Sequence, residues 1–225
     1  MRKAGVGKQA IAFVSMLLAA NAYGQSKAPR YVAPDIVSEG DIAYPVNTTA
    51  TGLVTLLLSL DNSARVTNTQ VLRDIPTLTS AAQSAAQTWS FKPASFNGKP
   101  VASSIPVSVV FSPFNPGDTE TSGMSVAASP PATPAGAAQY TPPQITSASF
   151  AMYPPNTLAQ GTVVLDVAIG KTGQVTGVQV VRGVEALTGP AVSAVKTWSY
   201  SPASANGRPI AAKVVIAFVF QRNLN

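Results

Sequence analysis

The side chains available for acid–base chemistry in this 225-residue chain are its nine carboxylates, because the sequence contains neither histidine nor cysteine. Without cysteine there is no thiol nucleophile, disulfide or thiolate-bound metal, and without histidine the usual general base near neutral pH is missing. The carboxylates belong to Asp35, Glu39, Asp41, Asp61, Asp74, Asp118, Glu120, Asp166 and Glu185. No pair among them has a spacing that points to acid–base catalysis. We therefore expect a protein that is not an enzyme and has no cofactor, metal site or small-molecule substrate.

Two further patterns suggest phosphate or nucleic-acid binding but fall short of it. The segment Gly170-Lys171-Thr172-Gly173 lacks the spacing and the following helix of a phosphate loop. The net charge of +6 includes three basic residues among the first eight positions, and the other basic residues are scattered singly. Nucleic-acid binding sites gather their charge on one surface, so we expect no nucleic-acid partner.

The first 24 residues are typical of a secretory signal peptide. Arg2, Lys3 and Lys8 precede an apolar run over residues 10–20, and small residues suited to signal peptidase follow it. The run is shorter than the roughly 20 residues that a membrane-spanning helix needs. We predict a cleaved signal at residues 1–24 and a periplasmic protein. The alternative is an uncleaved anchor in the inner membrane, with the rest of the chain facing the periplasm.

The rest of the sequence contains the same unit twice. A shift of 109 residues places Tyr44-Pro45 on Tyr153-Pro154, Trp89 on Trp198 and Phe111 on Phe220, with no gap. We predict repeats at residues 31–111 and 140–222. Residues 112–139, rich in proline, alanine and serine, are expected to form a linker between two independent domains.

Each repeat predicts a β-hairpin, a helix and a last strand. A hairpin is expected at residues 162–181, where a short turn joins two β-branched runs, and another at the equivalent residues 53–72. Apolar residues spaced by three and four then predict helices that lead to Trp89 and Trp198, and Thr77 or Thr79 is a candidate cap of the first helix. The predicted fold class is α+β, with two tandem small two-layer domains, each a three-stranded antiparallel sheet with one main helix.

The last strand of each repeat is the predicted interaction site. Since the hairpin makes the first two strands neighbours, the last strand must lie at an edge, where unpaired backbone groups can bind an extended segment. The predicted binding residues are Val214, Val215, Ile216, Ala217, Phe218, Val219 and Phe220 in the second repeat, and Ile105, Val107, Val109 and Phe111 in the first. The second of these strands is apolar on both faces, so an equally weighted interpretation is that the other repeat or a homodimer partner covers it. In the first repeat, Pro106 removes one backbone N–H donor near the start of the last strand.

Arg73 and Arg182 occupy the same position in the two repeats, at the end of the second strand. They are candidates for contacting a carboxylate of a ligand. The simpler interpretation is a solvated charge at a strand end.

The order of these motifs resembles the C-terminal domain of TonB. The second repeat contains a glycine turn before Gln174-Val175, then an alanine-rich helix, Trp198-Ser199-Tyr200-Ser201-Pro202 and Asn206-Gly207-Arg208-Pro209. The first repeat contains the counterparts Trp89-Ser90-Phe91-Lys92-Pro93 and Asn97-Gly98-Lys99-Pro100. The resemblance covers both repeats and is closer in the second, which keeps the turn glycines.

This resemblance implies a periplasmic module that grips the N-terminal segment of an outer-membrane transporter by strand addition to its last strand. The family's energy transducers also need an inner-membrane helix that bears a histidine, and this chain contains no histidine. Our leading interpretation is a secreted, non-catalytic protein that binds envelope or transporter proteins. The alternatives are a membrane-anchored energy transducer, and a structural protein whose repeats pair with each other or in a homodimer.

Overall fold

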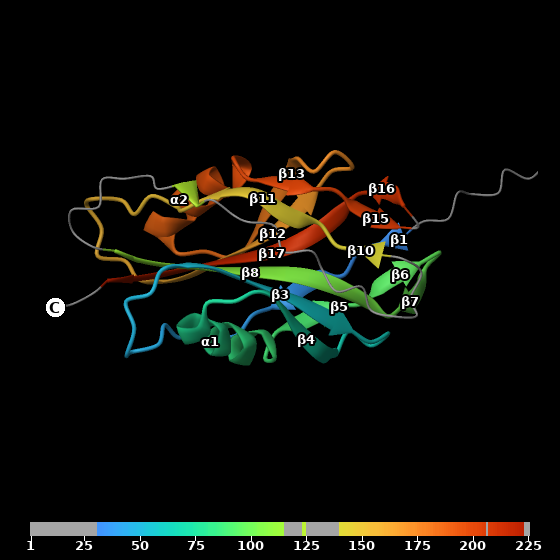
Figure 1. Ribbon diagram of the computed structural model, residues 1–225, viewed down its shortest axis with the longest axis horizontal. Coiled ribbons are helices and arrows are strands. Elements are labelled where there is room, and N and C mark those ends of the chain that lie inside the picture. Colours follow the sequence, from blue (N-terminus) through green and yellow to red (C-terminus); the bar gives the residue numbers. More distant parts are fainter. Residues whose placement is uncertain (1–30, 115–122, 125–139, 206, 223–225) are drawn as a thin grey trace, which may run out of the picture.

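The computed structural model describes residues 31–114, 123–124, 140–205 and 207–222, which form two copies of one unit (Figure 1). The predicted signal peptide and most of the predicted linker lie outside the described residues. Within the described part, neither helix has the length and apolar character needed to cross a membrane.

The described strands and helices follow the same order in both repeats. The first repeat contains β1 (Tyr31–Val32), β2 (Asp35–Ser38), β3 (Gly52–Leu60), β4 (Val66–Arg73), α1 (Pro76–Ala86), β5 (Ser90–Lys92), β6 (Ala94–Phe96), β7 (Lys99–Val101) and β8 (Ser103–Phe114). The second contains β10 (Tyr140–Thr141), β11 (Gln144–Ser149), β12 (Gly161–Ile169), β13 (Val175–Arg182), α2 (Glu185–Lys196), β14 (Ser199–Ser201), β15 (Ala203–Ala205), β16 (Arg208–Ile210) and β17 (Ala212–Arg222). Between the repeats, β9 (Gly123–Met124) pairs with β11. The predicted linker therefore contributes the end of β8 and one short strand to the fold.

The predicted hairpins are present, and the first repeat keeps its turn without the glycines of the second. Gly173 has a φ of +87°, and Ala64 adopts a φ of +64° at the equivalent position. The Asp61 carboxylate stabilises this turn by accepting the backbone N–H groups of Ser63 at 2.8 Å and Arg65 at 2.9 Å. The turn of the first repeat is therefore stabilised by the Asp61 side chain, whereas the turn of the second repeat relies on the conformational freedom of glycine.

Neither helix has a side-chain hydrogen bond from its N-cap residue. Ile75 and Val184 occupy the N-cap positions, and Pro76 follows at the first helical position of α1, where its missing N–H costs nothing. Thr79 is nevertheless involved, because its hydroxyl accepts the Ile75 N–H at 2.9 Å, and Thr188 does the same for Val184. The prediction that Thr77 or Thr79 caps the first helix is wrong, because Ile75 is its N-cap residue.

The two repeats share one six-stranded sheet, whose strand order is β13-β12-β17-β8-β3-β4. Each last strand pairs antiparallel with the first hairpin strand of its own repeat. At the centre, β17 and β8 pair in parallel from Val215↔Val107 to Arg222↔Phe114. The prediction of two independent domains is therefore wrong, because the edge strand of each repeat completes the sheet of the other.

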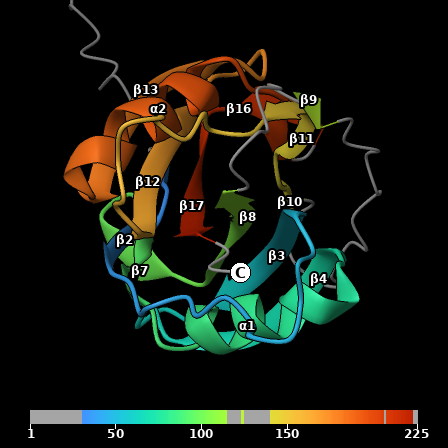
Figure 2. The same ribbon diagram turned by 90° about the vertical axis from the view of Figure 1, so that its left-hand side faces the viewer.

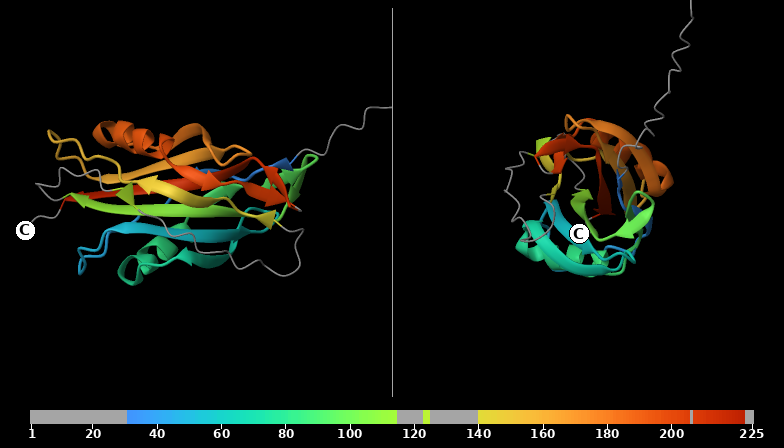
Figure 3. Two further views of the ribbon diagram at one scale, coloured as in Figure 1. Left: turned by 45° about the horizontal axis from the view of Figure 1, so that its top comes forward. Right: turned by 90° about the vertical axis from the view of Figure 1, so that its right-hand side faces the viewer.

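The parallel pairing places the two helices on opposite faces of the sheet. Equivalent strands that run side by side in parallel are related by a half-turn about an axis along the strands, and this rotation turns the sheet over. Accordingly, α2 lies above the sheet and α1 below it in Figure 1, and the end-on view in Figure 2 shows the same separation. The short hairpins β6–β7 and β15–β16 lie at the same end of the molecule (Figure 1 and Figure 3).

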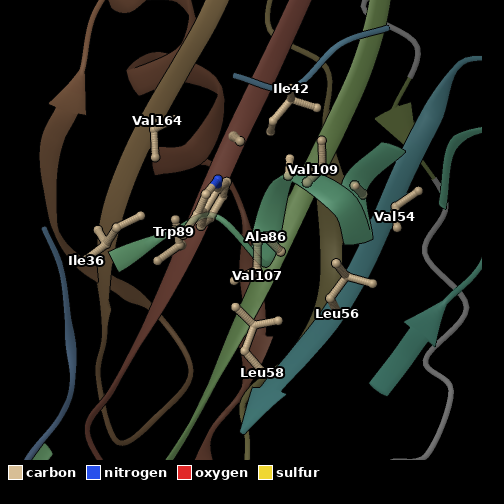
Figure 4. Close-up of a cluster of buried hydrophobic side chains, with 14 of the residues drawn as sticks. Ile36, Ile42, Val54, Leu56, Leu58, Ala86, Trp89, Val107, Val109 and Val164 are labelled. Atoms are coloured by element: carbon tan, nitrogen blue, oxygen red, sulfur yellow. The ribbon is translucent and has the colours of Figure 1, made fainter. Parts of the chain in front are cut away.

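Each hydrophobic core contains residues from both repeats. The cluster beneath α1 includes Val164, Val215, Ala217 and Val219 of the second repeat, and Figure 4 shows Val164 beside Trp89 and Ile36. The cluster beneath α2 includes Leu53 and Val110 of the first. The odd-numbered residues of β17 pack under α1 and the even-numbered ones under α2, which explains why this strand is apolar on both faces.

Candidate protein-interaction site

The predicted binding residues of β8 and β17 lie in the middle of the shared sheet. All eleven of them are at most 4% exposed. β17 is paired with β12 on one side and β8 on the other, and β8 is paired with β17 and β3. The parallel pairing of β8 begins at Val107, directly after Pro106. This agrees with the prediction that Pro106, which has no backbone N–H, removes one donor from this edge.

The prediction that these strands lie at the edge of their own repeat's sheet is confirmed, but the edges are not open to a partner in this structure. The alternative interpretation, in which the other repeat covers them, is the one that the pairing of β8 with β17 bears out. A docking segment would have to break backbone hydrogen bonds worth on the order of 1 kcal/mol each. It would also expose side chains whose burial contributes about 1.5–3 kcal/mol each. Strand exchange at this position is therefore strongly disfavoured.

The open edges of the sheet are its two outer strands, β4 and β13. Among the described residues, no strand pairs with the outer side of either one. Alternate residues of an edge strand direct their N–H and C=O groups away from the sheet, and these groups are available to an extended segment. Both strands are eight residues long, contain no proline, and carry no charge before the terminal arginine. They thus lack the charges and prolines that commonly protect an edge.

The two strand-end arginines differ in their surroundings. Arg182 forms ion pairs with Asp41 and, at 3.9 Å, with Glu39, which both come from the first repeat. Within the described residues, Arg73 has no carboxylate within ion-pair distance. The two repeats thus have the same residue at this position, but among the described residues only Arg182 forms ion pairs. Contact of these arginines with a ligand carboxylate stays a prediction.

A charged cluster lies where β2 of the first repeat meets the second repeat. Lys213 of β17 donates to the Asp166 Oδ2 atom of β12 at 2.8 Å and also to the Asp35 carboxylate of β2. Asp166 is 6% exposed, and its Oδ1 atom has no hydrogen-bond partner in the structure. The first repeat has Leu57 at the position of Asp166 and Ser104 at that of Lys213. This cluster therefore occurs once and joins the two repeats.

The protonation equilibria of the cluster follow from its burial. Burial raises the pKa of Asp166, and the Lys213 ammonium beside it opposes this effect only in part. Burial lowers the pKa of Lys213, but the hydrogen bonds and charges of Asp166 and Asp35 outweigh it, so that this pKa is raised. The arrangement holds an ammonium and two carboxylates together, and no neighbouring histidine or thiol offers them a catalytic partner.

Sequence reasoning did not identify this cluster or the outer edges. Asp166 had a local signal, because it is a carboxylate within a run of β-branched residues, and a charge buried in a strand needs a partner. Its partners lie 47 and 131 positions away, so spacing does not reveal them. The sequences of β4 and β13 do not indicate that these strands are the open edges, because this depends on which strands join the two repeats.

Comparison with known proteins identifies both repeats. The family described as Gram-negative bacterial TonB protein C-terminal matches residues 45–113 and 156–221. The two matched segments cover more than half of the chain and agree with the two tandem copies seen in the sequence and the fold. No curated protein and no solved structure gave a significant match.

Proposed function

Because the chain belongs to the Gram-negative bacterial TonB protein C-terminal family, we propose that it is a non-catalytic binding protein of the periplasm that docks extended segments of envelope or outer-membrane transporter proteins. The family indicates an envelope protein engaged in transport-related interactions. We propose further that the protein is secreted through a cleaved signal peptide and that it docks its partners by β-strand addition.

The observation that carries the docking proposal is the pair of outer edges, β4 and β13, which contain no proline and no internal charge; each strand has two register shifts against its inner neighbour. Both strands are eight residues long, and no described strand is hydrogen-bonded to the outer side of either one. An extended segment that adds there gains backbone hydrogen bonds without breaking any of the sheet. We therefore assign docking to the outer edges instead of the central strands β8 and β17.

Hydrogen–deuterium exchange on the full chain tests this assignment. Synthetic peptides that cover the N-terminal periplasmic segments of outer-membrane transporters from the same bacterium are added one at a time. We expect a binding peptide to slow the exchange of amides in β4 or β13, while the amides of β8 and β17 stay slow with or without peptide. Protection that appears only in β8 or β17 would contradict docking at the outer edges.

A structural role is the second candidate, and the β8–β17 pairing favours it, because the repeats satisfy their own last strands. If no transporter segment protects any strand, this role replaces docking. Secretion is tested separately by sequencing the mature N-terminus. An intact Met1 in the membrane fraction would instead support the anchored transducer.

A further inference from the structure

The outer edge of β4 carries basic side chains at both ends and no charge between them. Arg65 directly precedes the strand and is exposed, and Arg73 ends it. Within the described part of the chain, neither guanidinium forms an ion pair. The residues between them are Val66, Thr67, Asn68, Thr69, Gln70, Val71 and Leu72. At about 3.3 Å per residue, the two arginines are roughly 26 Å apart along the strand.

The carboxylates nearest to these arginines in the sequence are engaged in local contacts. Asp61 accepts the backbone N–H groups of Ser63 and Arg65, and Asp74 accepts the hydroxyl of Thr79. Hydrogen bonds from neutral groups do not cancel the charge of a carboxylate. The two guanidiniums are available to a partner because neither Asp61 nor Asp74 lies within ion-pair distance of Arg65 or Arg73 in the described part of the chain.

The two faces of β4 differ, so an added strand would meet two different surfaces. Val71 pairs with Leu56 and Thr69 with Leu58, and both leucines belong to the core beneath α1. On the other face, Gln70 and Asn68 are polar and partly or fully exposed. A segment beside β4 would extend the apolar face with every second side chain and place the others among polar groups.

The equivalent edge of β13 has a different charge pattern. Arg182 is already paired with Asp41, which is 83% exposed, and with Glu39. A carboxylate that approaches this end would meet two carboxylates around one arginine. An acidic segment is therefore favoured at β4 and disfavoured at β13.

We infer that β4 is the docking edge for an extended segment of a partner protein, about nine residues long, with alternating apolar and polar residues and an acidic residue at each end. This inference rests on the proposed function and names its edge and its ligand chemistry. The carboxylates pair with Arg65 and Arg73, while the backbone pairs with the free side of β4.

The test measures binding of a designed peptide to the full chain by fluorescence anisotropy. The peptide alternates valine and threonine over seven residues and has a glutamate at each end, and a second peptide has lysines instead. We expect the acidic peptide to bind about ten-fold more tightly, as two surface ion pairs allow. Methylation of alternate amides in the acidic peptide should abolish binding, because the backbone bonds are then lost.

Charge reversal locates the contact. The double substitution Arg65→Glu with Arg73→Glu should weaken the acidic peptide by about ten-fold or more and make the lysine peptide the tighter ligand. The control, Lys99→Glu with Arg208→Glu, changes the net charge equally in the exposed Asn-Gly hairpins and should leave both affinities unchanged.

Cross-linking distinguishes the two outer edges, and the absence of native cysteine makes an introduced one unique. Asn68→Cys in β4 and Gly177→Cys in β13 are at equivalent positions, and a Cβ at Gly177 meets only Ala168 at an ordinary 3.7 Å. A thiol-bearing acidic peptide should form a disulfide with the first variant and not with the second.

Equal affinity for the two peptides, or cross-linking at position 177 instead of 68, would overturn the inference. The proposed function fails by a different measurement, namely when no transporter segment protects either outer strand from exchange. If transporter segments protect β13 while the acidic peptide does not bind, docking stands and the choice of β4 is wrong.

Discussion

Lys213 forms ion pairs with two carboxylates from different repeats, Asp35 of the first and Asp166 of the second. Removing one member of a buried ion pair leaves an uncompensated charge and typically costs about 3–5 kcal/mol, whereas replacing the whole pair by apolar groups is often neutral. The first repeat has an uncharged pair instead, with Leu57 and Ser104 at the positions of Asp166 and Lys213.

We predict that Lys213→Ser lowers the free energy of unfolding by about 3 kcal/mol near neutral pH. Adding Asp166→Leu to this variant should restore most of the loss, because no buried carboxylate then lacks a partner. Urea unfolding of the wild type, both single variants and the double variant measures the coupling. The control Arg208→Ser removes an exposed charge and should change little. Equal stability of the Lys213→Ser and double variants would contradict the coupling.

The loss caused by Lys213→Ser should also depend on pH. Burial raises the pKa of Asp166, so the folded chain holds this proton more tightly than the unfolded chain does. Stability from this group is present below the unfolded value of 3.8 and is lost as the pH rises through the raised pKa. Without Lys213 that pKa rises further. The loss should therefore be smaller at about pH 5 than at about pH 8.

At the scale of elements, the two helices have the same place in their repeats but different sequences. α2 contains Gly189-Pro190 where α1 has Ser80-Ala81. Pro190 lies beyond the first turn of α2, so its missing N–H leaves the Ala186 carbonyl without its helical bond. A Cβ at Gly189 would meet nothing within 4 Å. α2 is therefore held by packing on the sheet more than by its own propensity.

We predict that Gly189→Ser with Pro190→Ala, which copies the α1 sequence, stabilises the chain by about 1–3 kcal/mol. The gain should appear as a higher midpoint in thermal unfolding followed by circular dichroism. The matched control Ala81→Pro in α1 should destabilise by about 3 kcal/mol. An unchanged or lower midpoint for the double variant would show that the proline is needed in α2.

At the scale of the whole molecule, the shared cores should make the two repeats one cooperative unit. Val110 of the first repeat packs in the core of the second, and Val215 of the second packs in the core of the first. Unfolding either repeat would expose both faces of the central strands. No repeat can therefore unfold without removing part of the other's core.

Each repeat contains one tryptophan, and this allows cooperativity to be measured. Trp89→Phe leaves Trp198 as the reporter of the second repeat, and Trp198→Phe leaves Trp89 for the first. We expect each variant to unfold in urea with the same midpoint by fluorescence and by far-UV circular dichroism. Val110→Ala added to the Trp89→Phe variant should shift both signals together. Separate midpoints would indicate two independent domains.

The elements of each repeat could be predicted from the sequence because their signals are local. The β-branched runs, the spacing of apolar residues before Trp89 and Trp198, and the Asn-Gly turns each act within about a dozen residues. The position of the last strand at the edge of its repeat followed from the hairpin alone. The cap of the first helix differs from the prediction, because Thr79 binds the backbone of the N-cap residue Ile75 instead of being the cap itself.

What the sequence determined by itself is two copies of one α+β unit, each with an apolar last strand at its edge. The tertiary structure decided what covers that edge. An apolar strand such as Val214–Phe220 satisfies its backbone equally well with a partner segment, a second chain or its own duplicate, and local sequence does not distinguish them. Because β8 pairs with β17, the open edges of the shared sheet are β4 and β13. The same pairing brings Lys213 beside Asp35, which is 178 residues away in the sequence.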